Sequence, residues 1–167
     1  MDPVTAIGVA GSAVGIAGFG LQIATVLQTY IEASLEADDR IREIANDINA
    51  TASALQRLQA VIDEDEKLAE GRVFNVEGLK SVNRISLQCD AVFKRTVELL
   101  NKAGRPGAEL SNSERAKDLK LHTLDHLKWP WLEPKILRCS QELERLLLKM
   151  LLMLQISSLA HQQRRYV

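Results

Sequence analysis

Two histidines on successive turns of an expected helix come nearest to a metal site. His122 and His126 are four residues apart and Asp118 lies one turn earlier, so the three side chains would share one helix face. Imidazole and carboxylate groups are zinc ligands. However, no glutamate follows the first histidine as in HExxH, and the third histidine, His161, is remote in the sequence. The pattern favours ordinary histidines on a charged helix, and no metal or cofactor is expected.

The two cysteines, Cys89 and Cys139, lie on or beside apolar stripes and are expected to be buried, inert thiols. Two cysteines cannot build a disulfide framework, which favours a reducing compartment. Neither the phosphate-binding pattern GxxxxGK(S/T) nor the nucleophile elbow GxSxG occurs in the sequence. The sequence therefore predicts a protein that is not an enzyme.

Glycines at helical spacing give the sharpest pattern in the chain. Gly8, Gly11, Gly15 and Gly18 alternate by three and four residues, and Gln22, Thr25 and Thr29 continue the series. They predict one helix face of small and polar residues, a surface that lets helices approach closely in a membrane. Close packing in a soluble core is the alternative. In either case we expect this face to pack against another helix in the resting bundle.

The same segment is free of charge from Pro3 to Ile31, a run of 29 residues. At ~1.5 Å per residue, a helix of that length exceeds the ~30 Å hydrocarbon core of a bilayer. Its apolar content is modest, because glycine, alanine and hydroxyl residues interrupt the large side chains. The segment is therefore suited to burial in protein or in lipid.

The charge of the chain is balanced overall and polarised along its length. The 167 residues carry 21 Lys and Arg and 22 Asp and Glu, a net charge of -1, which excludes a basic footprint for nucleic acid over the whole chain. Residues 1–70 contain 12 acids and 4 bases, whereas residues 71–167 contain 17 bases and 10 acids. The basic residues either contact anionic lipid or a partner, or complement the acidic half within the fold. The candidates are Lys94, Arg95, Lys102, Arg105, Arg115, Lys117, Lys120 and Lys128.

Apolar periodicity predicts helices throughout. Beyond a first helix ending near residue 35, we expect helices over 38–67, over 76–103, and from a capping box at 111–114 to about 128. The acidic run 63–66 should fray the end of its helix, and the proline-containing segment 129–134 should interrupt or kink the chain before a last helix to about 164. The fold class is an all-α, up-and-down bundle of four to five long helices. It forms a single domain over 1–167, with residues 1–35 as the glycine-rich helix and 36–167 as the remaining bundle.

The last helix is apolar nearly all round between Leu146 and Leu154, where Lys149 is the sole charge. A helix without a polar face is central in its bundle or covered by a partner. Leu147, Leu148, Leu151 and Leu152 are the candidate partner face.

Two groups of residues resemble a known family. They are the opening Met1-Asp2-Pro3-Val4 with its glycine-rich helix, and Trp129-Pro130-Trp131 with the later Glu142-Leu143-Glu144-Arg145-Leu146 and Leu151-Leu152-Met153-Leu154. The chain resembles the N-terminal domain of fungal NLR-like proteins in the HeLo-like and SesA-like group. The resemblance implies a helical bundle that executes regulated cell death by membrane targeting, with Gly8, Gly11, Gly15 and Gly18 on the inserting helix. It also implies a nucleotide-binding receptor module, in the same or another chain, as a partner.

The leading hypothesis is thus a non-enzymatic effector that moves from the cytoplasm to anionic membranes and self-associates through its glycine face. The alternative is a soluble homotypic or receptor-docking helical module without membrane activity.

Overall fold

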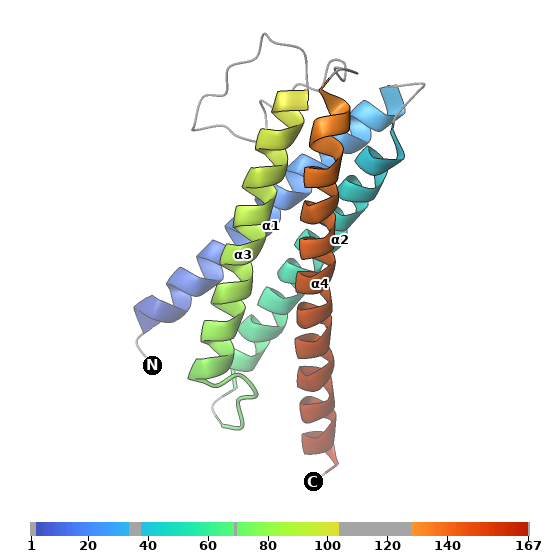
Figure 1. The fold of residues 1–167 in the computed structure, drawn as a ribbon. Helices are drawn as coiled ribbons and strands as arrows, with labels where there is room; N and C mark the ends of the chain where they lie inside the picture. The colour runs from blue at the N-terminus through green and yellow to red at the C-terminus, as the bar shows by residue number, and fades with distance from the viewer. Residues whose placement is uncertain (1–2, 34–37, 69, 104–127, 167) are drawn as a thin grey trace.

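The computed structural model describes residues 3–33, 38–68, 70–103 and 128–166, with side chains of the first helix described from residue 13 to 32. This part of the chain forms four α-helices: α1 (Pro3–Ala33), α2 (Asp39–Glu66), α3 (Val76–Ala103) and α4 (Trp129–Arg165) (Figure 1). Consecutive helices run in alternating directions, which confirms the predicted all-α bundle. The helix expected to begin at 111–112 lies outside the described residues.

The four helices form a ring of neighbours around the core. α1 packs against α2 and α3, and α4 packs against the same two helices from the other side. Within the described helices α1 and α4 do not touch, and α2 and α3 meet only slightly. The outer surfaces of α1 and α4 therefore lie on opposite sides of the molecule.

The apolar periodicity that predicts α2 and α3 forms one stripe along each helix, and both stripes are buried throughout. In α2 they are Ile41, Ile44, Ile48, Ala52, Leu55, Leu58 and Ile62, and in α3 they are Val82, Ile85, Cys89, Val92, Thr96 and Leu99. Such a stripe on one side of a helix is the sequence feature that fixes which face turns to the core. Between the helices the fully buried Phe93 contacts Phe19 edge to face, with ring centroids 6.3 Å apart.

Asp38 links the beginnings of α2 and α4. Its carboxylate caps α2 by accepting a hydrogen bond from the Arg40 amide at 2.8 Å. The other carboxylate oxygen accepts a hydrogen bond from Trp129 Nε1 at 2.9 Å. The Asp38 carboxylate thus accepts hydrogen bonds both from an amide in the first turn of α2 and from the buried indole of Trp129, which is distant in the sequence.

The acidic end of α2 does not fray, so that expectation was wrong. The helix continues to Glu66, and Asp65 is 1% exposed. Its carboxylate accepts hydrogen bonds from the amides of Val73 (2.8 Å) and Phe74 (2.9 Å), which fixes the loop that leads to α3. The other three acids of the run are exposed or half-buried. Asp65, in contrast, has hydrogen-bond partners in the loop that the sequence did not reveal.

The expected interruption at 129–134 was also wrong, because α4 begins at Trp129 and includes Pro134. Pro130 lies in the first turn, where a backbone amide would have no partner within the helix. Pro134 removes a single backbone hydrogen bond of the helix, the one to the carbonyl of Pro130. Both prolines are exposed, so water can solvate that carbonyl. The helix therefore starts at the two tryptophans instead of after them.

Candidate functional site

The glycine side of α1 faces outward. Gly15 is exposed and Gly18 half-buried, and an added Cβ at either position would meet nothing within 4 Å. Gln22, Thr25 and Thr29 continue this side and are exposed. We call these five residues the outward α1 face. The expectation that the glycines pack against another helix at rest was wrong for Gly15 and Gly18. Gly8 and Gly11 belong to α1, but their surroundings lie outside the described side chains.

The opposite side of α1 supplies the packing. Its buried residues are Ala13, Ile16, Ala17, Ile23, Ala24, Leu27 and Ile31. Since large apolar side chains gain most from leaving water, they determine which side of the helix turns inward. Gly15 and Gly18 are left on the outside by default.

Hydroxyls on the outward α1 face are satisfied by their own helix. Thr25 Oγ1 donates to the Leu21 carbonyl at 2.9 Å, and Thr29 Oγ1 donates to the Thr25 carbonyl at 3.0 Å. The Gln28 amide donates to Glu32 Oε1 at 3.1 Å. The hydroxyl groups therefore need no water as a partner, which lowers the cost of placing this face against lipid or another helix.

Gly20 is the glycine that does make a close contact, and it is not among the four predicted site glycines. A Cβ there would lie 2.7 Å from Phe93 Cε2 and 2.8 Å from Ala52 Cβ. Gly20 thus allows α1 to approach α2 and α3 together. No local signal separates it from its neighbours, because its requirement arises from the crossing of three helices.

The outer side of α4 carries an apolar face. Its exposed fractions are 67% for Leu148, 43% for Leu151, 59% for Leu152, 56% for Ile156 and 54% for Leu159. We call these five residues the α4 apolar face. Of the predicted partner face, Leu148, Leu151 and Leu152 are exposed, whereas Leu147 packs against the core. The sequence analysis missed Ile156 and Leu159, which follow Leu152 at helical spacing of four and seven residues.

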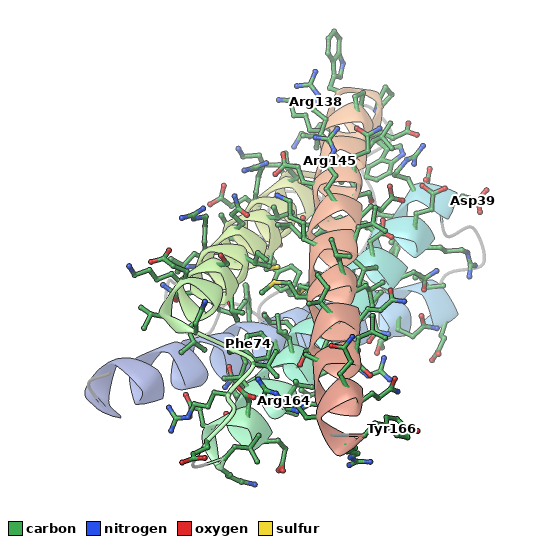
Figure 2. All side chains as sticks on the ribbon, turned by 90° about the horizontal axis from the view of Figure 1, so that it is seen from below. Asp39, Phe74, Arg138, Arg145, Arg164 and Tyr166 are labelled. Carbon is green, nitrogen blue, oxygen red and sulfur yellow. The ribbon has the colours of Figure 1, made fainter. Side chains whose placement is uncertain are left out.

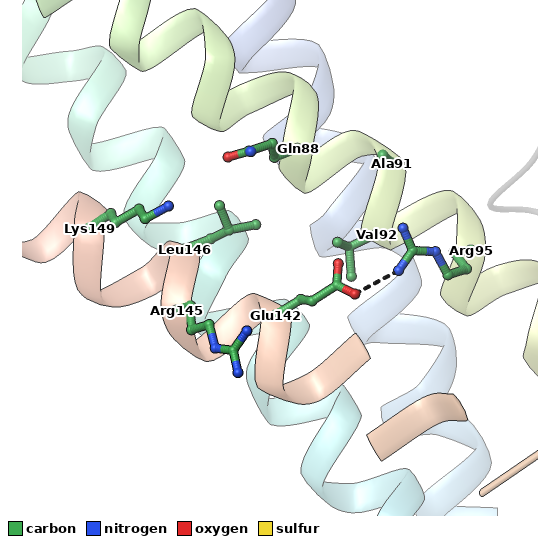
Figure 3. Close-up of a pocket in the computed structure, with 8 residues that line it drawn as sticks. All are labelled: Gln88, Ala91, Val92, Arg95, Glu142, Arg145, Leu146 and Lys149. Carbon is green, nitrogen blue, oxygen red and sulfur yellow. Dashed lines mark hydrogen bonds and ion pairs between the residues drawn. The ribbon is translucent and has the colours of Figure 1, made fainter. Parts of the chain in front are cut away.

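A groove of about 380 Å³ runs between α3 and α4 beside this face (Figure 3). Arg95 of α3 and Glu142 of α4 form an ion pair across it, with 2.8 Å between Nη1 and Oε1. Arg145 and Lys149 line the α4 side. The groove therefore has more basic than acidic groups.

The predicted basic cluster is divided by the fold. Lys94 pairs with Asp90 and Arg95 pairs with Glu142, so these two serve contacts within the bundle. Lys102 is exposed in the last turn of α3, and Lys128 precedes α4. The rest of the cluster lies outside the described residues, as does the proposed histidine face: Arg105, Arg115, Lys117, Lys120, His122 and His126.

Both cysteines are buried free thiols, as predicted. Burial raises the pKa of Cys89 to about 12, and burial also raises the pKa of Cys139, whose thiol lies against Thr96 of α3. A raised pKa disfavours the nucleophilic thiolate. Within the described ranges, no cluster of three or more His, Cys, Asp or Glu side chains could hold a metal.

Acidic side chains of α2 and α4 lie close together around Asp47. Burial raises the pKa of Asp47, the nearby Ser140 hydroxyl lowers it, and the carboxylates of Glu144 and Glu43 raise it further. In the unfolded chain this pKa returns to its ordinary value of 3.8. Between the two values the folded state binds more protons, so the stability contributed by Asp47 falls as pH rises through this window.

Replacing Asp47 with asparagine is therefore expected to stabilise the bundle at pH 7 by roughly 0.5 kcal/mol, a small amount because the site is partly solvated. Denaturant titration should show that the gain shrinks as pH approaches the ordinary aspartate value. A variant less stable than wild type at pH 7 would mean that the favourable interaction of the Asp47 carboxylate with Ser140 outweighs the burial and repulsion.

Comparison of the chain with protein-family models, with curated proteins and with solved structures finds no match.

Proposed function

We propose that this protein is a non-enzymatic effector module that acts in regulated cell death by targeting membranes through α1, as its resemblance to the HeLo-like group implies. The observation that carries the proposal is the outward α1 face. A long helix that is uncharged from Pro3 to Ile31 presents small residues to the surface, with open space before Gly15 and Gly18. Such a face is a close-approach surface for a second helix in lipid.

The length and polarity of α1 support the same role. Residues Ala13–Glu32 are long and apolar enough to cross a bilayer, although a core helix of a soluble protein has the same properties. The threonine hydroxyls of this segment are bonded to helix carbonyls. Transfer to lipid would therefore leave few unsatisfied groups.

Packing holds α1 in place at rest. Ile16, Ile23, Leu27 and Ile31 are buried, and each contributes about 1.5–3 kcal/mol, together roughly 6–12 kcal/mol. This is comparable with the ~5–15 kcal/mol net stability of a domain, so α1 does not leave spontaneously. We propose that clustering through a receptor module, together with anionic lipid, releases it, and that lipid then buries the same side chains.

The test is dye release from vesicles that contain anionic lipid. Replacing both Gly15 and Gly18 with leucine is expected to reduce release to the level of vesicles without protein, because bulky side chains prevent close approach. The matched control replaces both glycines with alanine, which keeps the face small and should preserve release. Both positions are open in the bundle, so both variants should remain folded.

Circular dichroism and denaturation establish that each variant is folded before release is compared. If a folded double-leucine variant releases dye as well as wild type, under forced clustering, the outward α1 face has no role in membrane activity. Release by neither wild type nor control would contradict the membrane function itself.

Docking without membrane entry is the second candidate function. The α4 apolar face favours it, because a monomer rarely exposes this many neighbouring large apolar side chains on one helix. A protein that associates in solution and binds no vesicles would support this function over the first.

A further inference from the structure

The α4 apolar face has the spacing of a coiled-coil seam. Leu148, Leu152, Gln155 and Leu159 follow one another at intervals of four, three and four residues, and all four are exposed. Two helices that carry such a seam pack along it, with these residues at the alternating a and d positions. In the heptad, Leu148 and Gln155 occupy d, and Leu152 and Leu159 occupy a.

The flanks of the seam differ in charge. On the flank next to α3 lies Lys149, which lines the groove shared with Arg95 (Figure 3). Arg145, seven residues before Leu152, lies at an a position at the N-terminal end of the seam. On the flank next to α2 lies Glu144, close to Asp47 and Glu43. The flank next to α3 is thus basic at Lys149, and the flank next to α2 is acidic at Glu144.

This asymmetry selects the partner and its direction. A second copy aligned in parallel by a two-fold axis along the helix brings the acidic flank of each copy to the basic flank of the other. An antiparallel pair would bring like flanks together. In the parallel arrangement Glu144 occupies a g position, and Lys149 of the second copy occupies the e position that faces it.

The neighbouring g and e positions carry Leu151 and Ile156, so the same alignment would also pair two apolar side chains that are exposed in the single chain. We infer that the α4 apolar face is the interface of a parallel homodimer of this protein. The polar Gln155 within the seam fixes the register and limits affinity, so the dimer forms and dissociates with concentration.

The inferred dimer leaves the membrane helix free. α1 and α4 do not touch and lie on opposite sides of the ring of helices (Figure 1). Pairing through α4 therefore does not cover the outward α1 face, and parallel alignment points both copies of α1 the same way. The inference does not require membrane activity, because the dimer is measured without lipid.

Sedimentation equilibrium of the full chain, without lipid, tests the interface. Wild type should show a concentration-dependent dimer, whereas Leu148→Glu with Leu152→Glu should be monomeric. Both leucines are exposed in the single chain, so the variant should remain folded by circular dichroism. The matched control is Leu87→Glu on α3, where the leucine is 54% exposed but outside the seam, and this variant should dimerise as wild type does.

A charge exchange tests the direction. Glu144→Lys places lysine opposite Lys149 in a parallel dimer, and Lys149→Glu places glutamate opposite Glu144, so each variant alone should dimerise at least tenfold more weakly. An equimolar mixture of the two should regain wild-type affinity, because both cross-pairs are then of opposite sign.

Several results would overturn the inference. Wild type could be monomeric at every concentration, the double glutamate variant could still dimerise, or the mixture could fail to recover. If wild type is monomeric and the double glutamate variant loses binding to anionic vesicles, the α4 apolar face is a lipid surface instead. A wild type that is monomeric at every concentration yet still releases dye would refute this interface without affecting the proposed function.

Discussion

Replacing Gly20 with leucine is expected to lower the free energy of unfolding by roughly 3 kcal/mol or more, because the side chain has no space. The first added carbon alone would lie 2.7 Å from the ring of Phe93 and 2.8 Å from Ala52. Both neighbours are fully buried, so neither can move into solvent. Gly20→Ala should be milder, since its gain of about 1 kcal/mol in helix propensity offsets part of the overpacking.

Gly15 and Gly18 provide matched controls on the same helix. Alanine at either position meets nothing within 4 Å, and each substitution should stabilise the bundle by ~0.5–1 kcal/mol. Urea titrations of the single variants measure all of these differences. The close three-helix contact would be refuted by equal stabilisation from alanine at positions 15, 18 and 20.

Replacing Asp65 with alanine is expected to lower stability by about 3 kcal/mol, because the partly buried amides of Val73 and Phe74 lose their charged acceptor. Asp65→Asn retains one oxygen and should lose about half as much, roughly 1.5 kcal/mol. The control is Glu64→Ala, an exposed carboxylate of the same turn that pairs with the exposed Lys67, where a change within about 0.5 kcal/mol is expected.

Hydrogen exchange locates the effect of the Asp65 change. The amides of Val73 and Phe74 should lose protection more than those in the middle of α3. Arg164 at the end of α4 donates to the Arg72 carbonyl of the same loop at 3.4 Å, so protection at the end of α4 should fall as well (Figure 2). Uniform loss across the bundle, or a stability equal to that of Glu64→Ala, would contradict a local anchoring role for this carboxylate.

The parts of the fold that the sequence predicted are those with a single amphipathic stripe. α2 and α3 agree with the expected ranges to within one residue at each end, and all their stripe residues are buried. Burial of one apolar face dominates the energy of such helices, so periodicity alone locates them.

The errors arose where a distant residue decides the local structure. Asp65 is one of four consecutive acids, and its loop partners lie eight and nine residues away. The glycine series on α1 predicted close packing, but Ile23 and Leu27 took the inward side and left Gly15 and Gly18 outside. Gly20 became the close contact because Phe93 and Ala52 meet at that point, which no pattern within α1 records.

The candidate surfaces, too, could be predicted only in part from the sequence. On α4, Leu148, Leu151 and Leu152 were found because the helix is apolar all round, a property visible in the sequence. Ile156 and Leu159 were missed because polar residues separate them from that run. Which apolar side chains of α4 remain exposed depends on where α2 and α3 make contact, and this is a property of the assembled bundle.

Because both thiols are buried, their chemical labelling reports when the helices of the bundle separate. Cys139 faces α3 from α4, and Cys89 lies within the buried stripe of α3, whereas α1 contains no cysteine. Alkylation requires an exposed thiolate, so the rate at which Cys139 is labelled follows the separation of α4 from α3. If α1 leaves while α3 and α4 stay paired, Cys139 remains protected from alkylation. The labelling rate of Cys139 therefore distinguishes the release of α1 from unfolding of the whole bundle.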